Sequence, residues 1–186
     1  MSDVSKEGVK FVGFNEGCKL KAYRDVAGVL TIGYGHTGKD VHEGMVITQE
    51  EAEELLKTDL TIAVLAVNRL VKVPLSQNQF DSLVDFVFNV GVQAFKTSSL
   101  LRELNDGEYG PAAEQFLRWK YAGGKLVSGL LERRKREKEL FEYSKPLDDI
   151  TRKTAVFKWL TDGVKEIMEK VEKPASTALA KRSEDL

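Results

Sequence analysis

The sequence predicts an α+β fold that is mostly helical, with two lobes and one small β-hairpin. Apolar residues recur at helical spacing through most of the chain, which is the pattern of amphipathic helices. Residues 19–34 are instead rich in β-branched and aromatic side chains and contain several glycines, which is typical of a hairpin. A helical pattern of about 20 residues follows Thr48, and its length of about 30 Å is enough to connect two lobes.

The first two elements are an N-terminal helix and the hairpin. Apolar side chains at helical spacing give residues 5–15 one buried face, and Gly17 is expected to end this helix. In the hairpin, Gly28 marks the turn, and the stretch VLTIGYG that follows it has the composition of a returning strand.

Two capping boxes begin the central helices. Thr48 and Ser76 are each followed three residues later by Glu or Gln, which satisfies the first N–H groups of a helix. The first box opens the connecting helix, which Pro74 must end because proline has no N–H to donate. The second box opens a deeply buried helix that Gly91 is expected to close.

The remaining elements are predicted to be helical. Helices are expected at about residues 97–105, 111–119, 130–143 and 151–172, with a polar tail, expected to be disordered, at the end.

We place a domain boundary near residues 146–149. Residues 1–146 then form one domain, in which residues of about 15–60 make the small lobe. The helical lobe consists of about residues 73–146 together with the N-terminal helix.

Composition excludes several classes of partner. A formal net charge of −1 gives no basic surplus, so a nucleic-acid partner is not expected. No apolar run reaches the ~18–20 residues of a membrane span, so stable membrane insertion is not expected either. Cys18 is the single cysteine, which excludes an intramolecular disulfide, and it is interpreted as a small packed residue.

Glu16, Asp25 and Thr31 are the residue types that acid–base hydrolysis of a glycoside requires. Apolar neighbours at the helix end are expected to desolvate Glu16, and a carboxylic acid that keeps its proton can donate it to a leaving group. Asp25 lies in a polar turn as a candidate base, and Thr31 returns across the hairpin as a hydroxyl that orients water. The spacing alone proves nothing, because 29 acidic residues offer many such pairs.

The neighbouring residues carry a family resemblance. The segment from Glu16 to His36, EGCKLKAYRDVAGVLTIGYGH, resembles the active-site signature of phage-type lysozymes, the muramidases and endolysins of glycoside hydrolase family 24. The resemblance continues in the lambdoid-phage branch of that family with FDSLVDFVFNVGVQAF, SSLLRELNDG and FLRWKYAGG followed by SGLLERRKREKELF. It covers about residues 5–146 and implies the two-lobed lysozyme fold.

The resemblance implies a role for each residue of the triad. Glu16 would protonate the oxygen of the β-1,4 bond between N-acetylmuramic acid and N-acetylglucosamine. Asp25 would activate a water that attacks from the opposite face, with Thr31 helping to hold that water. The product would have inverted configuration, and the two carboxyl groups should lie roughly 6.5–9.5 Å apart.

The resemblance also implies substrate contacts in the cleft between the lobes. The positions are Thr37, Phe88, Asn89, Ser98 (or its neighbour Ser99) and Gln115. Phe88 can equally be a core residue, and Trp119 and Tyr121 are interpreted as core aromatics rather than sugar-stacking ones.

Gly33, Gly35 and His36 are predicted to support the hairpin. The resemblance implies that His36 pairs with a carboxylate rather than acts in catalysis. His36 and His42 lack a third candidate ligand, so neither a metal nor another cofactor is expected.

The charged run ERRKREKE at residues 132–139 is predicted to be a solvated helix face with ion pairs one turn apart. A smaller role for its arginines, contact with anionic wall polymers, stays open.

The prediction for the whole chain is a peptidoglycan hydrolase that causes bacterial lysis. The alternative is a non-catalytic wall-binding or assembly module with the same fold. Unlike many lambdoid relatives, the sequence shows no N-terminal signal-anchor segment. We therefore expect synthesis in the host cytoplasm and holin-type release to the periplasm or cell wall. The helix at 151–172 is expected to pack on the enzyme, with partner binding, self-association or membrane contact as alternatives.

Overall fold

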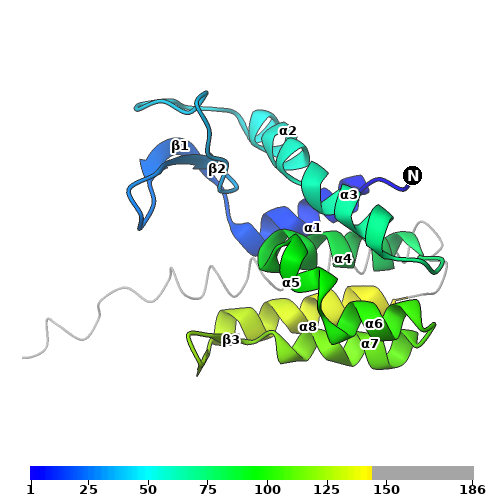
Figure 1. Cartoon of the computed structure of the whole chain (residues 1–186). Coiled ribbons are helices and arrows are strands. Elements are labelled where there is room, and N and C mark those ends of the chain that lie inside the picture. Colours follow the sequence, from blue (N-terminus) through cyan, green and yellow to red (C-terminus); the bar gives the residue numbers. More distant parts are fainter. Residues whose placement is uncertain (144–186) are drawn as a thin grey trace, which may run out of the picture. The chain divides into compact units, whose positions relative to one another are not determined.

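The computed structural model describes residues 1–143 (Figure 1). Contacts group Met1–Ser144 into one compact unit. The predicted helix at 151–172, the tail and the boundary near residues 146–149 lie outside the described residues, so these stay predictions.

The N-terminal helix and the hairpin have the predicted form. Helix α1 spans Lys6–Glu16, with the Ser5 side chain capping its first turn and Gly17 ending it. Strands β1 (Lys19–Arg24) and β2 (Leu30–Gly33) pair antiparallel, and Tyr23 lies opposite Thr31 in their register.

The connecting helix is divided in two, which differs from the prediction of one continuous helix. Helix α2 spans Gln49–Asp59 and α3 spans Thr61–Leu70. Between them Leu60 has φ −69° and ψ −15°, close to a tighter 3₁₀ turn. The Leu60 N–H still bonds to the Leu56 carbonyl at 2.9 Å, so the two helices follow one another end to end, as Figure 1 shows.

The predicted buried helix is α4, Gln77–Val90, which has the capping box at Ser76 and ends at Gly91. Its residues from Gln79 to Val87 are all buried. The helices α1, α3 and α8 pack against it, so α4 is the centre of the helical lobe.

The rest of the lobe contains two elements that periodicity did not predict, the five-residue helix α5 and a second hairpin. In chain order the elements are α5 (Val92–Lys96), α6 (Ser99–Asn105), α7 (Tyr109–Gln115), a 3₁₀ helix η1 (Phe116–Arg118), β3 (Tyr121–Ala122), β4 (Lys125–Leu126) and α8 (Ser128–Glu142). The predicted helix at 111–119 therefore starts earlier and tightens at its end. The second hairpin turns at Gly123 and Gly124, whose φ values of 55° and 74° suit glycine.

Two apolar clusters form the core. The larger one fills the helical lobe, and a smaller one beneath the first hairpin contains Ile32, Val41, Ile47 and Ala52. Tyr34 packs against both clusters.

Gly13 brings α1 close to Tyr34. A Cβ atom at Gly13 would lie 2.8 Å from Cε1 of Tyr34, closer than such atoms approach. The absence of a side chain therefore lets the hairpin lobe pack against the first helix.

For residues 132–139 the predicted ion pairs one turn apart are confirmed, but the predicted solvated face is wrong for three of the charged residues. Arg133, Arg134 and Glu137 are only 5%, 0% and 0% exposed. Helix α8 packs along α4, and these three side chains point into that interface. The solvated side of the same run contains Lys135 and Glu132, which pair at 2.7 Å.

Candidate active site

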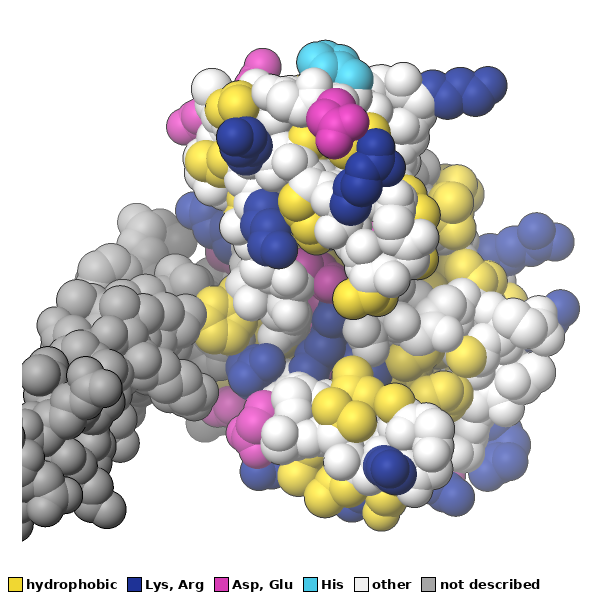
Figure 2. Space-filling model, turned by 90° about the vertical axis from the view of Figure 1, so that its left-hand side faces the viewer, with side chains coloured by type: hydrophobic (Ala, Val, Ile, Leu, Met, Phe, Trp, Pro, Cys, Tyr) yellow, Lys and Arg dark blue, Asp and Glu magenta, His cyan; other side chains and the backbone are white. Residues whose placement is uncertain are grey.

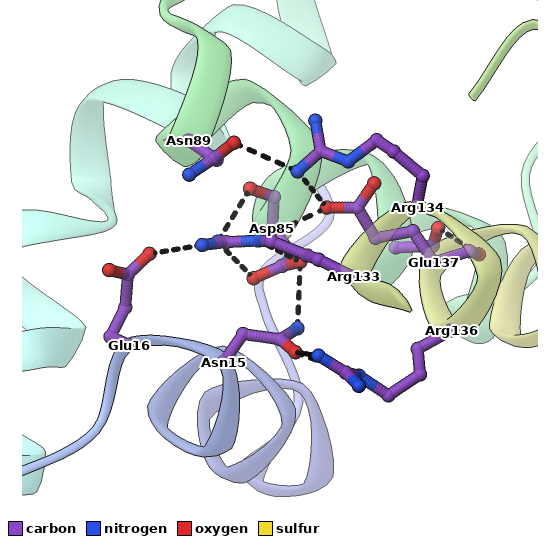
Figure 3. A network of polar contacts seen from close by, with 9 residues as sticks. Asn15, Glu16, Asp85, Asn89, Arg133, Arg134, Arg136 and Glu137 are labelled. Carbon is purple, nitrogen blue, oxygen red and sulfur yellow. Dashed lines mark hydrogen bonds and ion pairs between the residues drawn. The ribbon is translucent and has the colours of Figure 1, made fainter. Parts of the chain in front are cut away.

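Glu16 is the last residue of α1, and its side chain is 24% exposed. Its Oε1 accepts a hydrogen bond from Nη1 of Arg133 at 2.7 Å (Figure 3). The surroundings thus differ from the expected apolar neighbours, because a buried guanidinium lies against the carboxylate. A negative charge at a helix C-terminus is unfavourable, and Arg133 offsets it.

Arg133 is shared among three carboxylates. Besides Glu16, it contacts Asp85 of α4, at 2.8 Å from Nη2 to Oδ1, and Glu137 of α8, at 3.3 Å from Nε to Oε1. Burial works to lower the pKa of Arg133, but the charges of Asp85 and Glu16 outweigh it and raise that pKa. Arg133 therefore stays a cation that joins α1, α4 and α8.

A second link holds the end of α1 in place. Asn15 donates from Nδ2 to Oδ2 of Asp85 at 3.0 Å and accepts from Nε of Arg136 at 3.0 Å. Figure 3 shows Asn15 and Glu16 reaching from α1 toward the same buried polar network. The backbone that carries Glu16 is thus fixed from two sides.

The other buried arginine, Arg134, lies against Glu137 and Asn89. Its Nη2 donates to Oε1 of Glu137 at 2.7 Å and to Oδ1 of Asn89 at 2.9 Å. Its guanidinium carbon stands 5.0 Å from the ring centre of Phe86, over the face of the ring. Asn89, a predicted substrate contact, is exposed, and the hydrogen bond from Arg134 of α8 orients its side chain.

Asp25 lies in the turn of the first hairpin and is half-buried. Its Oδ1 accepts hydrogen bonds from the N–H groups of Ala27 and Val29, at 2.9 and 2.8 Å. Gly28, with φ 80°, closes this turn. Among the described residues, no donor reaches Oδ2, so this oxygen can accept from water.

Thr31 is only 3% exposed, and its hydroxyl donates to the Val29 carbonyl at 3.0 Å. The same carbonyl accepts from the N–H of Asp25 at 3.0 Å. Val29 therefore draws Thr31 and Asp25 together at the base of the turn. The threonine hydroxyl keeps its acceptor capacity for a water molecule.

His36 has the predicted structural setting. Its Nδ1 lies 2.9 Å from Oδ1 of Asp59, and its Nε2 lies 3.0 Å from Oδ2 of Asp40. Burial works to lower the pKa of His36, but the hydrogen bonds to Asp59 and Asp40 raise it above its ordinary value. Gly33 and Gly35, with φ 62° and 96°, make the tight turn that presents the imidazole.

The remaining predicted positions differ in what their side chains do. Ser98 is buried, and its hydroxyl caps α6 by accepting from the Leu101 N–H at 3.0 Å, so it is committed to the fold. Ser99 instead donates to Oε1 of Gln115 at 2.9 Å. Thr37 is exposed on the first lobe.

The aromatic predictions are partly confirmed. Phe88 is half-buried and packs against the larger core cluster. Trp119 packs edge-on to Phe86 with ring centres 5.4 Å apart, as expected of a core aromatic. The prediction for Tyr121 is wrong, because this ring is 58% exposed on the second hairpin, and Cys18 is likewise exposed rather than packed.

The space-filling view in Figure 2 shows a hollow on the face that it presents, with acidic and basic side chains at its base.

Residues 1–143 contain no group of three histidine, cysteine or acidic side chains able to hold a metal ion. No helix in the same range is long and apolar enough to cross a membrane. The described site residues supply two carboxyl groups, a hydroxyl group and a guanidinium cation.

Comparisons with known proteins give a consistent result. The family model for phage lysozyme matches residues 14–137, which contain all the candidate catalytic residues. The endolysin of Bacillus phage B103 is 41% identical over 189 residues, covering 95% of this chain and 71% of that protein. That match extends well beyond residue 137 and includes most of residues 147–186.

Solved structures agree with the sequence comparison. A P22 lysozyme mutant has a TM-score of 0.73 and 48% identity, covering 76% of this chain and 99% of that one. The muramidase domain of SpmX from Asticaccaulis excentricus has a TM-score of 0.71 and 40% identity, with the same coverage of 76% and 99%. The α+β fold predicted from the sequence is therefore confirmed.

Proposed function

This chain belongs to the phage lysozyme family, and we infer from that membership that it is a glycosidase that hydrolyses peptidoglycan. One observation carries the inference. The family match covers residues 14–137, from the end of α1 through the hairpin to α8. None of the comparisons favours a non-catalytic wall-binding module.

For the chemical step, we propose that Glu16 is the general acid. It would give its proton to the glycosidic oxygen between N-acetylmuramic acid and N-acetylglucosamine. Arg133 favours the ionised form of Glu16, but it keeps Asp85 as a partner when Glu16 is neutral, so protonation of Glu16 leaves no unpaired cation. The proton can thus come and go without breaking the network.

Asp25 is the proposed base. With Oδ1 occupied by two backbone N–H groups, Oδ2 is the oxygen available to take a proton from the attacking water. Thr31, tied to the same turn through Val29, is the proposed second contact for that water. A water between acid and base gives inversion, and the expected carboxyl separation of roughly 6.5–9.5 Å is that of an inverting pair.

The proposed sugar contacts are Thr37, Phe88, Asn89 and Gln115. Asn89 is supported by its hydrogen bond from Arg134, and Gln115 by its position next to Ser99. Since the Ser98 hydroxyl is used within the fold, Ser99 is the better candidate of the two serines.

Peptidoglycan is the partner that the family implies, and cell lysis is the proposed outcome. Synthesis in the host cytoplasm and holin-type release to the wall remain proposals, as does association through residues 151–172, which lie outside the described residues. No nucleic acid and no stable membrane insertion are expected.

Product analysis tests the function. Purified peptidoglycan is digested with wild type, Glu16→Gln, Asp25→Asn and the exposed control Glu50→Gln, and the muropeptides are identified by mass spectrometry. We expect new reducing N-acetylmuramic acid ends from wild type and Glu50→Gln, and at least about a hundredfold less from the two triad variants. Cleaved amide bonds, or full activity in Glu16→Gln, would contradict the proposal.

A further inference from the structure

Two carboxylates share one buried site behind Glu16. The side chains of Asp85 on α4 and Glu137 on α8 are both fully buried. Oε1 of Glu137 accepts from Arg133 and Arg134, whereas Oε2 is buried and no donor within residues 1–143 reaches it. A buried carboxylate oxygen without a donor is costly, so the site favours a hydrogen bound at Oε2.

A proton on Glu137 supplies that hydrogen. Burial, followed by the charge of Asp85, raises the pKa of Glu137 well above its ordinary value. Two ionised carboxylates in one buried site repel each other, whereas a protonated Glu137 is neutral and removes that repulsion. The structure and the electrostatics therefore agree on a neutral Glu137 at acidic pH.

The ionisation state of Glu137 determines how many carboxylates share the positive charge of Arg133. While Glu137 is neutral, the positive charge of Arg133 is shared between Glu16 and Asp85 only. When Glu137 loses its proton to water, a third anion competes for the same guanidinium at 3.3 Å. Less of the Arg133 charge is then left to favour the ionised form of Glu16.

We propose that Glu137 is a positioning residue for the catalytic acid: by ionising as the pH rises, it draws Arg133 away from Glu16 and helps Glu16 to keep the proton that it must donate. The inference rests on the proposed role of Glu16 as general acid. Glu137 touches no substrate, and it acts only through Arg133.

The other charged groups around Glu137 are accounted for. Asp85 comes from α4 and Glu16 from α1, while Arg133, Arg134 and Arg136 come from α8 itself. Two other elements, α7 and η1, also pack on α8. The charged residue of α7 is Glu114, which is exposed and pairs with Lys138; that of η1 is Arg118, which is exposed and donates to Gln115. Glu137 is therefore the buried group whose charge changes this network.

The test uses Glu137→Gln in the full-length protein. A glutamine keeps an oxygen that can accept from Arg133 and Arg134, but it cannot ionise. The matched control is Glu139→Gln, two residues further along α8 on an exposed position. For each protein, kcat/KM on soluble peptidoglycan fragments is measured across pH 4–9.

We expect Glu137→Gln to lose activity at a lower pH than wild type. The alkaline limb of the profile should move down by about 0.5–1 pH unit, while the acidic limb and the control profile stay in place. A folded Glu137→Gln whose profile coincides with that of wild type would overturn the proposal, since a purely structural glutamate would not move the limb.

A second measurement does not depend on the variant. Carboxyl ¹³C NMR of the wild type should show Glu137 titrating above the ordinary glutamate value of about 4.3, and titration at or below that value would overturn the proposal. The two roles fail separately. Full activity in Glu16→Gln would overturn the acid assignment, whereas an inactive Glu16→Gln beside an unshifted Glu137→Gln overturns only the positioning role.

Discussion

Nδ1 of His36 lies 2.9 Å from Oδ1 of Asp59, and this contact ties the turn after β2 to the C-terminal end of α2. The histidine side chain is 12% exposed and that of Asp59 is 28% exposed, so the pair is partly shielded from water. The first hairpin is held to the connecting helices by a charged contact in addition to the small apolar cluster beneath it.

Replacing Asp59 should destabilise the protein in a pH-dependent way. Because the pKa of His36 is raised in the folded state, its contribution is fully present below the ordinary value of 6.5 and is lost as the pH rises through the folded value. We expect Asp59→Asn to lower the free energy of unfolding by roughly 1–2 kcal/mol at pH 5.5 and by clearly less at pH 9.

Urea unfolding at the two pH values measures this effect. Asp40→Asn serves as the control, since Asp40 contacts the same imidazole from an exposed position and should matter less. An equal loss for Asp59→Asn at both pH values would show that the charge on His36 is not involved.

The configuration of the product distinguishes the two possible geometries of a carboxyl pair. An inverting pair releases the α-anomer from the β-1,4 bond, whereas a retaining pair releases the β-anomer. We expect ¹H NMR of the first turnover products to show the α-anomer before mutarotation mixes the two. A β-anomer would mean that Asp25 attacks the sugar itself.

Substitutions at Thr31 separate its hydroxyl from its methyl group. Thr31→Ala removes the proposed water contact, so kcat should fall by at least about tenfold with little change in KM. Thr31→Ser keeps the hydroxyl and should retain most of the activity. Equal losses in both variants would indicate that packing, not water binding, is what Thr31 provides.

Substitutions at Ser98 and at Gln115 should have opposite effects on stability and on KM. Ser98→Ala removes the cap of α6 and should cost about 1 kcal/mol of stability while leaving KM unchanged. Gln115→Ala should leave stability nearly unchanged and raise KM several-fold, if Gln115 contacts sugar. Thermal melts and initial rates on the same samples give both quantities, and a raised KM in Ser98→Ala would reverse the assignment.

Local signals in the sequence predicted the main helices and the first hairpin well. The boxes at Thr48 and Ser76 and the glycines at positions 17 and 91 act within one helical turn, so they can be read without knowing the fold. Short elements gave no such signal. Helix α5 has five residues, and each strand of the second hairpin has two, which is too few for a period to show.

The surroundings of Glu16, the proposed catalytic acid, could not be predicted in the same way. The run at residues 132–139 has the composition of a solvated face, and nothing within it reveals that Asp85, 48 residues away from Arg133, lies opposite. Burial of Arg133 and Glu137 depends on that distant carboxylate. A family resemblance predicted the triad, but only the packing of α8 on α4 shows what surrounds Glu16.

The sequence separation between α1 and α8 determines when the site can form during synthesis. Glu16 and Arg133 lie 117 positions apart, and Asn15 and Arg136 lie 121 apart. A growing chain that has passed β4 already carries Glu16, Asp25 and Thr31, yet it lacks the cation that holds the acid in place. These contacts can form only after α8 has left the ribosome and packed against α4, so the site is completed late in the synthesis of the chain.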